Sequence, residues 1–82
     1  MTVRLTVDGT IALEGSCPTE DAEQLQRYLL SNPAAKVDWR GCLTAHTAVI
    51  QIMLAFRPVV VGPPAGDLLR THIGPLLAEK AP

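Results

Sequence analysis

Aromatic residues and clustered positive charge are both scarce in this chain. One Trp, one Tyr and one Phe occur among 82 residues, and seven Lys and Arg stand against eight Asp and Glu. The basic residues are scattered, whereas nucleic-acid binding relies on a clustered basic surface that neutralises phosphates. Single-stranded nucleic acid also needs aromatic side chains on which bases stack. The composition therefore argues against a nucleic-acid-binding protein.

The chain also lacks an apolar run long enough to cross a membrane. The longest run, residues 48–56, is interrupted by Gln51 and ends at Arg57, whereas a membrane span needs roughly 20 apolar residues. The first residues do not combine a charged region with a long apolar stretch, which is the pattern of a signal peptide. We expect a cytoplasmic protein with reduced thiols.

Cysteine is rare as well, and Cys17 and Cys42 are the only two. They could form one disulfide, but they are not the dense framework of a small secreted domain. Cys42 and His46 lie four residues apart, and a thiol with an imidazole can form a nucleophile–base pair or begin a metal site. Together with His72 these residues match no standard zinc spacing, because neither C-x-x-C nor H-x-x-x-H occurs. We expect no metal, cofactor or catalytic residue, with a small Cys/His metal protein or thiol enzyme kept as an alternative.

No motif for phosphate binding is present either. Residues 62–66 place two glycines between a predicted strand and a predicted helix. They do not form G-x-G-x-x-G, and they lack the lysine of a P-loop. A proline-rich turn explains this segment. Because no groups stand at a spacing suited to acid–base, nucleophilic or metal chemistry, the sequence favours a binding module over an enzyme.

Apolar residues, in contrast, make up 48% of the chain, which is enough for one hydrophobic core. At this length the chain is too short for two ordinary domains. We expect one domain over residues 1–77 and a flexible tail over residues 78–82. Small domains often gain buried area by oligomerisation, so a homodimer is a further expectation.

The N-terminal third predicts a β-hairpin followed by a helix. Apolar and polar residues alternate over residues 1–8, Asp8-Gly9 is a two-residue turn signal, and residues 10–14 alternate again. Residues 15–18 break the strand pattern. Thr19 is a favourable helix N-cap, and acidic residues follow it in the first turn. The helix ends before Pro33, because proline disfavours the α conformation in the residue that precedes it.

The remainder alternates strands with helices. Residues 34–39 predict a strand that ends before Arg40, and residues 44–56 predict a helix that is apolar around most of its circumference. Such a helix is buried on several sides, and one of these sides can face a partner. The β-branched run at residues 58–61 is typical of a buried parallel strand.

Residues 67–77 predict the last helix, which must kink or restart at Gly74-Pro75. The complete order is ββαβαβα. Strands that alternate with helices imply right-handed crossovers and a sheet with a parallel part. The predicted fold is therefore a single α/β domain with a mixed sheet and with helices packed mainly on one face.

Residues 37–55, VDWRGCLTAHTAVIQIMLA, resemble the central motif of STAS domains (sulfate transporter and anti-sigma factor antagonist). In that family a strand ending in Val-Asp-Leu leads through a short loop to Asp-Ser-Ser-Gly or Asp-Thr-Ala-Gly, which opens a Leu-rich helix. Residues 13–15, LEG, match the family's Leu-x-Gly before its first helix, and residues 59–62, VVVG, match its last strand. The resemblance covers nearly the whole chain except the tail.

The signature loop departs from the family pattern. His46 stands where the family has Asp, Thr47 matches the first hydroxyl residue, and Val49 replaces the Gly. Ala48 stands where the anti-sigma factor antagonists carry their phosphorylated Ser, so the usual phosphoserine switch cannot operate here. The triplet is more similar to Asp-Thr-Ala, which occurs in the small cytoplasmic STAS subunit of bacterial phospholipid transporters.

The resemblance implies a non-catalytic, regulatory protein-binding module that docks through the loop and helix at residues 44–56. The implied partner is a serine kinase of the anti-sigma factor type or a transporter ATPase, and a cytoplasmic accessory subunit of a phospholipid ABC transporter is the alternative. Thr47 is the foremost candidate, although its hydroxyl could simply cap the helix. A phosphate on Thr47 would block a docked partner. The expected partner-binding or regulatory residues are His46, Thr47, Ala48, Ile50, Asp38 and Thr44.

Overall fold

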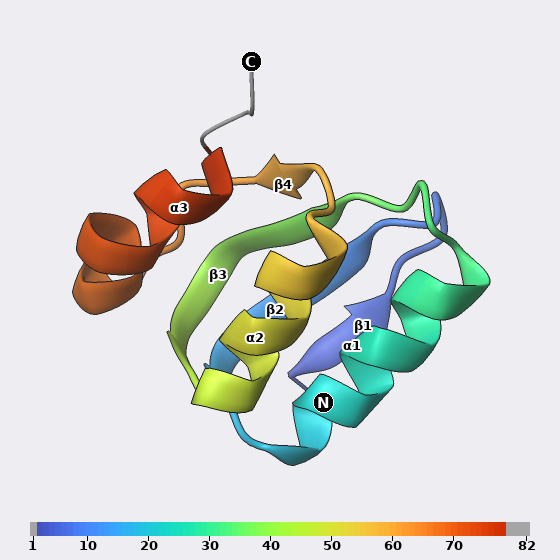
Figure 1. Ribbon diagram of the computed structural model, residues 1–82, viewed down its shortest axis with the longest axis horizontal. Coiled ribbons are helices and arrows are strands. Elements are labelled where there is room, and N and C mark those ends of the chain that lie inside the picture. Colours follow the sequence, from blue (N-terminus) through green and yellow to red (C-terminus); the bar gives the residue numbers. More distant parts are fainter. Residues whose placement is uncertain (1, 79–82) are drawn as a thin grey trace.

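The computed structural model describes residues 2–78 and contains a four-stranded sheet with helices (Figure 1). This architecture confirms the predicted α/β class and the predicted order of the elements. Strands and helices follow one another as β1 (Val3–Leu5), β2 (Ile11–Cys17), α1 (Glu20–Ser31), β3 (Val37–Ala45), α2 (Thr47–Phe56), β4 (Val60–Val61), the π-helical segment η1 (Leu69–Ile73) and α3 (Gly74–Ala78).

The sheet is mixed, as the sequence predicts, and its strands lie in the order β1-β2-β3-β4. The hairpin strands β1 and β2 are antiparallel, with Val3 opposite Leu13. The pairs β2–β3 and β3–β4 are parallel, with Gly15 opposite Cys42 in the first of them. Parallel neighbours need a crossover connection, and α1 and α2 supply these connections.

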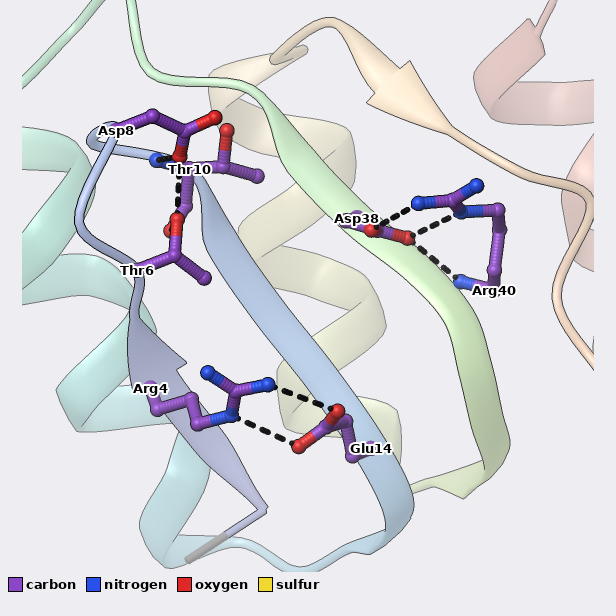
Figure 2. Close-up of polar contacts among 7 residues, drawn as sticks. All are labelled: Arg4, Thr6, Asp8, Thr10, Glu14, Asp38 and Arg40. Atoms are coloured by element: carbon purple, nitrogen blue, oxygen red, sulfur yellow. Dashed lines mark hydrogen bonds and ion pairs between the residues drawn. The ribbon is translucent and has the colours of Figure 1, made fainter.

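The helices α1 and α2 lie side by side on one face of the sheet (Figure 1). The core fills the space between these two layers, and its largest fully buried side chains include Trp39, Leu13, Leu25 and Met53. Figure 2 shows the opposite face of the sheet, where charged side chains replace the apolar ones. Within residues 2–78, no helix has both the length and the apolar character needed to cross a membrane.

The two central strands are longer than the sequence pattern predicts. β2 continues through Gly15 to Cys17 and stops only at Pro18, so the break predicted at residues 15–17 is wrong. β3 continues through Gly41 to Ala45, so the predicted end before Arg40 is wrong as well. These stretches pair with each other, and two register shifts accommodate the irregular spacing of their side chains. Each stretch provides the backbone hydrogen bonds that the other needs, which a local pattern cannot reveal.

Because β3 extends to Ala45, helix α2 begins later in the sequence than predicted. Thr44 and Ala45 pair with β2 and belong to the sheet, so α2 begins at Thr47 rather than at the predicted Thr44. At the other end of the sheet, β1 is shorter than predicted. Val7 is fully exposed in the turn rather than aligned with the strand, because the backbone N–H of Thr6 already closes the loop onto the carbonyl of Thr10 at 2.8 Å.

Helix ends also differ in detail from the prediction. Thr19 occupies the N-cap position of α1, but its side chain makes no capping hydrogen bond. In the last helix, the Gly74 N–H donates to the carbonyl of Leu69, five residues earlier. This wide turn precedes Pro75, whose ring is incompatible with a regular helical turn. α3 extends to Ala78, and the rest of the predicted tail, residues 79–82, lies outside the described residues.

Candidate protein-docking surface on helix α2

The start of α2 is held in place by His46. Its Nδ1 accepts a hydrogen bond of 3.0 Å from the backbone N–H of Ala48, and its backbone is extended, with φ −60° and ψ 149°. This geometry is that of a helix N-cap, in which a side-chain acceptor satisfies an N–H of the first turn. The backbone N–H of His46 donates to the carbonyl of Cys17 at 2.8 Å. The connection from β3 to α2 is therefore short and fixed at both ends.

Thr47 is the first residue of α2, and its side chain is exposed. The alternative role considered for Thr47, that of a capping hydroxyl, is filled by His46 instead. The Thr47 hydroxyl therefore lies at the surface, at the N-terminal end of a helix, where the helix dipole favours negative charge.

The outer side of α2 presents an uncharged strip of side chains. Thr47, Gln51 and Ala55 are exposed at four-residue spacing, and Ala48 and Ile52 are half-buried beside them. Residues four apart lie on the same side of a helix. We call these five residues the docking face.

The inner side of α2 is buried against the core. Val49, Ile50 and Met53 are buried there, and the α2 sequence contains no charged residue. The buried inner side and the uncharged outer side of α2 leave the docking face as neutral surface. In Figure 1, α2 lies between α1 and α3.

The neighbouring helix α1 provides a contrast. Its exposed residues include Glu20, Glu23 and Arg27, and an ion pair of 3.1 Å joins Arg27 Nη2 to Glu23 Oε1. A charged and solvated surface of this kind is the ordinary outer side of an amphipathic helix. The two helices share one layer of the fold but offer different chemistry to a partner.

The structure gathers four of the six predicted site residues at one end of β3. Thr44 is exposed in the strand, His46 caps the helix, and Thr47 and Ala48 begin it. Ile50 is 8% exposed and belongs to the core, so its side chain is not available to a partner in this structure.

Asp38 is also separate from that group. It lies near the start of β3, roughly 25 Å along the strand from His46 at about 3.3 Å per residue, and its carboxylate accepts hydrogen bonds from Arg40 on the face of the sheet opposite the helices (Figure 2).

That opposite face forms an open hollow of about 380 Å³. Two ion pairs border it (Figure 2): Arg4 Nε lies 3.0 Å from Glu14 Oε1, and Arg40 Nη2 lies 2.8 Å from Asp38 Oδ2. The residues that line the hollow are Arg4, Thr6, Ala12, Leu13, Glu14, Asp38, Arg40 and Gly41.

The charges of the hollow neutralise one another. Hydrogen bonds from Arg40 hold the pKa of Asp38 below its ordinary value, and Arg4 does the same for the pKa of Glu14. A charged ligand would therefore have to displace an existing ion pair. The alternation of polar and apolar residues along the strands is the only sequence signal of this polar face, and no motif marks its residues.

The two cysteines lie in the core, whereas His46 lies at the surface. Cys42 lies in β3, and its Sγ contacts the Cys17 Sγ at 3.9 Å and the carbonyl of Thr44 at 3.4 Å. His46 is exposed. Among residues 2–78, no three His, Cys, Asp or Glu side chains come together in a way that could hold a metal ion.

The turn at residues 62–66 is explained by close packing. The backbone N–H of Gly66 donates to the carbonyl of Cys42 at 3.0 Å. A Cβ atom on Gly66 would overlap the carbonyl oxygen of Leu43, so glycine allows this turn to lie directly against β3.

Comparison of the chain with protein-family models found no match, and no curated protein or solved structure matches it either.

Proposed function

We propose that this protein is a non-catalytic regulatory module that binds another protein through the docking face of α2. The observation that carries the proposal is the uncharged, exposed strip Thr47, Gln51 and Ala55 on a helix whose start is fixed by the His46 cap. The centres of protein interfaces are depleted of charged residues. A helix that is already packed also loses little conformational entropy when a partner binds.

The resemblance to STAS domains supports the same element. The residues that carry it, 37–55, include β3, the His46 cap and most of α2. In that family this loop and helix form the contact with the partner. The sequence resemblance and the neutral exposed surface thus point to one region, although each rests on a different observation.

The proposed partner is a serine kinase of the anti-sigma factor type. Ala48 has no hydroxyl group to phosphorylate, so any covalent control would have to use the exposed Thr47 next to it. A phosphate on Thr47 is compatible with the helix, because negative charge is favoured at a helix N-terminus. It would also place charge on the docking face and oppose binding.

Gln51 and Gln26 provide a matched pair of variants. Gln51 lies on the docking face, Gln26 lies on the charged outer side of α1, and both are exposed in the interior of a helix. The change of Gln to Glu adds one negative charge at almost constant shape. Gln51→Glu should therefore disturb docking, and Gln26→Glu should report any general effect of the added charge.

The test is an affinity pull-down from native lysate with the wild type and the two variants, read by mass spectrometry. We expect the wild type and Gln26→Glu to recover the same kinase, and we expect Gln51→Glu to lose it. If the wild type and Gln26→Glu recover a transporter ATPase and Gln51→Glu does not, the docking face is still the binding surface. The protein would then be the accessory subunit of a phospholipid transporter.

Equal recovery by all three proteins would place the binding surface elsewhere. If no partner is recovered, sedimentation of the three purified proteins decides the remaining case. A wild-type dimer that Gln51→Glu dissociates would make the docking face a self-association surface, and a wild-type monomer would remove support for the proposal.

A further inference from the structure

The two cysteines, 25 residues apart in sequence, meet inside the folded domain. The Sγ atoms of Cys17 and Cys42 lie 3.9 Å apart, within the range of a sulfur hydrogen bond. Both are free thiols, and they come from the adjacent parallel strands β2 and β3. Strand pairing therefore holds two reactive groups next to each other.

The two thiols of the pair differ in burial and in pKa. Cys17 is 3% exposed and Cys42 is fully buried. The hydrogen bond with Cys42, together with burial, raises the pKa of Cys17, and the same hydrogen bond lowers the pKa of Cys42. Of the two sulfurs, Cys42 is therefore the one that more readily becomes the nucleophilic thiolate.

We propose that Cys17 and Cys42 form an intramolecular disulfide when the protein meets hydrogen peroxide. The Cys42 thiolate attacks one peroxide oxygen, the O–O bond breaks, and a sulfenic acid and hydroxide result. The Cys17 sulfur then attacks the Cys42 sulfur, the S–O bond breaks, and water leaves as the S–S bond forms. Overall, two thiols lose two electrons and two protons, and one peroxide becomes two waters.

Burial determines the class of oxidant. A small uncharged molecule can reach a thiol inside a protein, whereas a bulky disulfide reagent such as oxidised glutathione requires the sulfur to be exposed for attack in line with its S–S bond. Cys17 lies at the end of β2, next to the turn into α1. In this proposal the neighbouring thiol, 3.9 Å away, captures the sulfenic acid before a second peroxide oxidises it further.

The position of the pair gives the disulfide a consequence for the fold. The carbonyl of Cys17 accepts the hydrogen bond from the His46 N–H at 2.8 Å, so the linkage would lie directly beneath the cap of α2. It would also enclose all of α1 in a covalent loop. The disulfide does not depend on the proposed docking function, because its formation can be measured on the isolated protein.

The experiment treats the purified, reduced wild-type protein with hydrogen peroxide and follows intact mass and free thiols. We expect both thiols to disappear together, the mass to fall by two hydrogens, and peptide mapping without reductant to show a Cys17–Cys42 link in a monomer. The reductant should restore the original mass.

Single variants separate this outcome from ordinary thiol oxidation. Cys17→Ala should gain oxygen at Cys42 rather than lose hydrogen, because no second thiol is present to displace water. The proposal is overturned if the folded wild type gains oxygen in the same way or links only between molecules. It is equally overturned if both thiols stay reduced under peroxide treatment that fully oxidises the urea-unfolded chain.

Discussion

The imidazole Nδ1 of His46 accepts a hydrogen bond of 3.0 Å from the backbone N–H of Ala48. Histidine thus fulfils at this helix the role that Asp, Ser, Thr or Asn fulfils at most helix N-termini.

Removal of the His46 Nδ1 acceptor should destabilise the folded protein. We expect His46→Ala to lower the free energy of unfolding by about 1 kcal/mol, the typical value of a lost N-cap, and His46→Asp to restore it. Urea unfolding followed by the fluorescence of Trp39 measures both, because this single tryptophan is 2% exposed in the folded chain. Equal stability of wild type and His46→Ala would show that the cap contributes nothing.

The close approach of Gly66 to Leu43 predicts that an alanine substitution is much more destabilising at Gly66 than at Gly41. A Cβ on Gly66 would overlap the Leu43 carbonyl oxygen, whereas a Cβ on Gly41 would meet only an ordinary contact of 3.6 Å with Glu14 Cγ. We expect Gly66→Ala to lower the free energy of unfolding by about 2 kcal/mol or more, as overpacking against a backbone atom does. Gly41→Ala should change it by less than about 0.5 kcal/mol. Similar unfolding midpoints for the two variants would contradict the close packing.

Two leucines of α1 offer a second matched comparison. Leu25 is fully buried, and Leu30 is 63% exposed in the same helix. We expect Leu25→Ala to cost about 2–5 kcal/mol because it leaves a cavity in the core. Leu30→Ala should cost less than about 0.5 kcal/mol. Thermal unfolding followed by circular dichroism distinguishes them, and a costly Leu30→Ala would mean that this exposed leucine is covered in solution.

The ion pairs of the open sheet face predict a loss of stability in acid. The pKa values of Asp38 and Glu14 lie below their ordinary values of 3.8 and 4.5 because Arg40 and Arg4 stabilise the carboxylates. A carboxyl with a depressed pKa contributes stability at neutral pH, and this contribution disappears as the pH falls through its folded-state pKa. We expect the stabilising contribution of the two carboxylates to be constant above about pH 5 and to be lost below about pH 4.

The double variant Asp38→Asn with Glu14→Gln measures this effect. Urea unfolding at neutral pH and at acid pH should show a smaller decrease in stability for the double variant than for the wild type. The difference should be modest, because solvent screens the half-exposed Arg4–Glu14 pair and reaches Arg40 beside the partly buried Asp38. An identical decrease in both proteins would mean that these pairs add no pH-dependent stability.

The amino-acid sequence by itself determined the order of elements and the character of their surfaces. Alternation in residues 1–8 and 10–14 predicted a hairpin, and the buried side of α1 consists of Ala22, Leu25 and Leu29, which recur at helical spacing in the sequence. These predictions succeeded because a period of two or of 3.6 residues is a local property of the chain.

The candidate site was determined only in part by the sequence. The loop at residues 46–48 was identified through the STAS resemblance, but the assignment of the cap to His46 depends on where β3 ends. Residues 40–45 contain a glycine and mixed polarity, so their local pattern is ambiguous. Their strand conformation depends on pairing with β2, far away in the sequence.

Tertiary structure alone decided which distant groups meet. The 3.9 Å separation of Cys17 and Cys42 follows from the register between β2 and β3, and the need for glycine at position 66 follows from its approach to Leu43. Register and close approach are set by the packing of the whole domain. No local pattern specifies them, because each depends on residues that only the folded chain brings together.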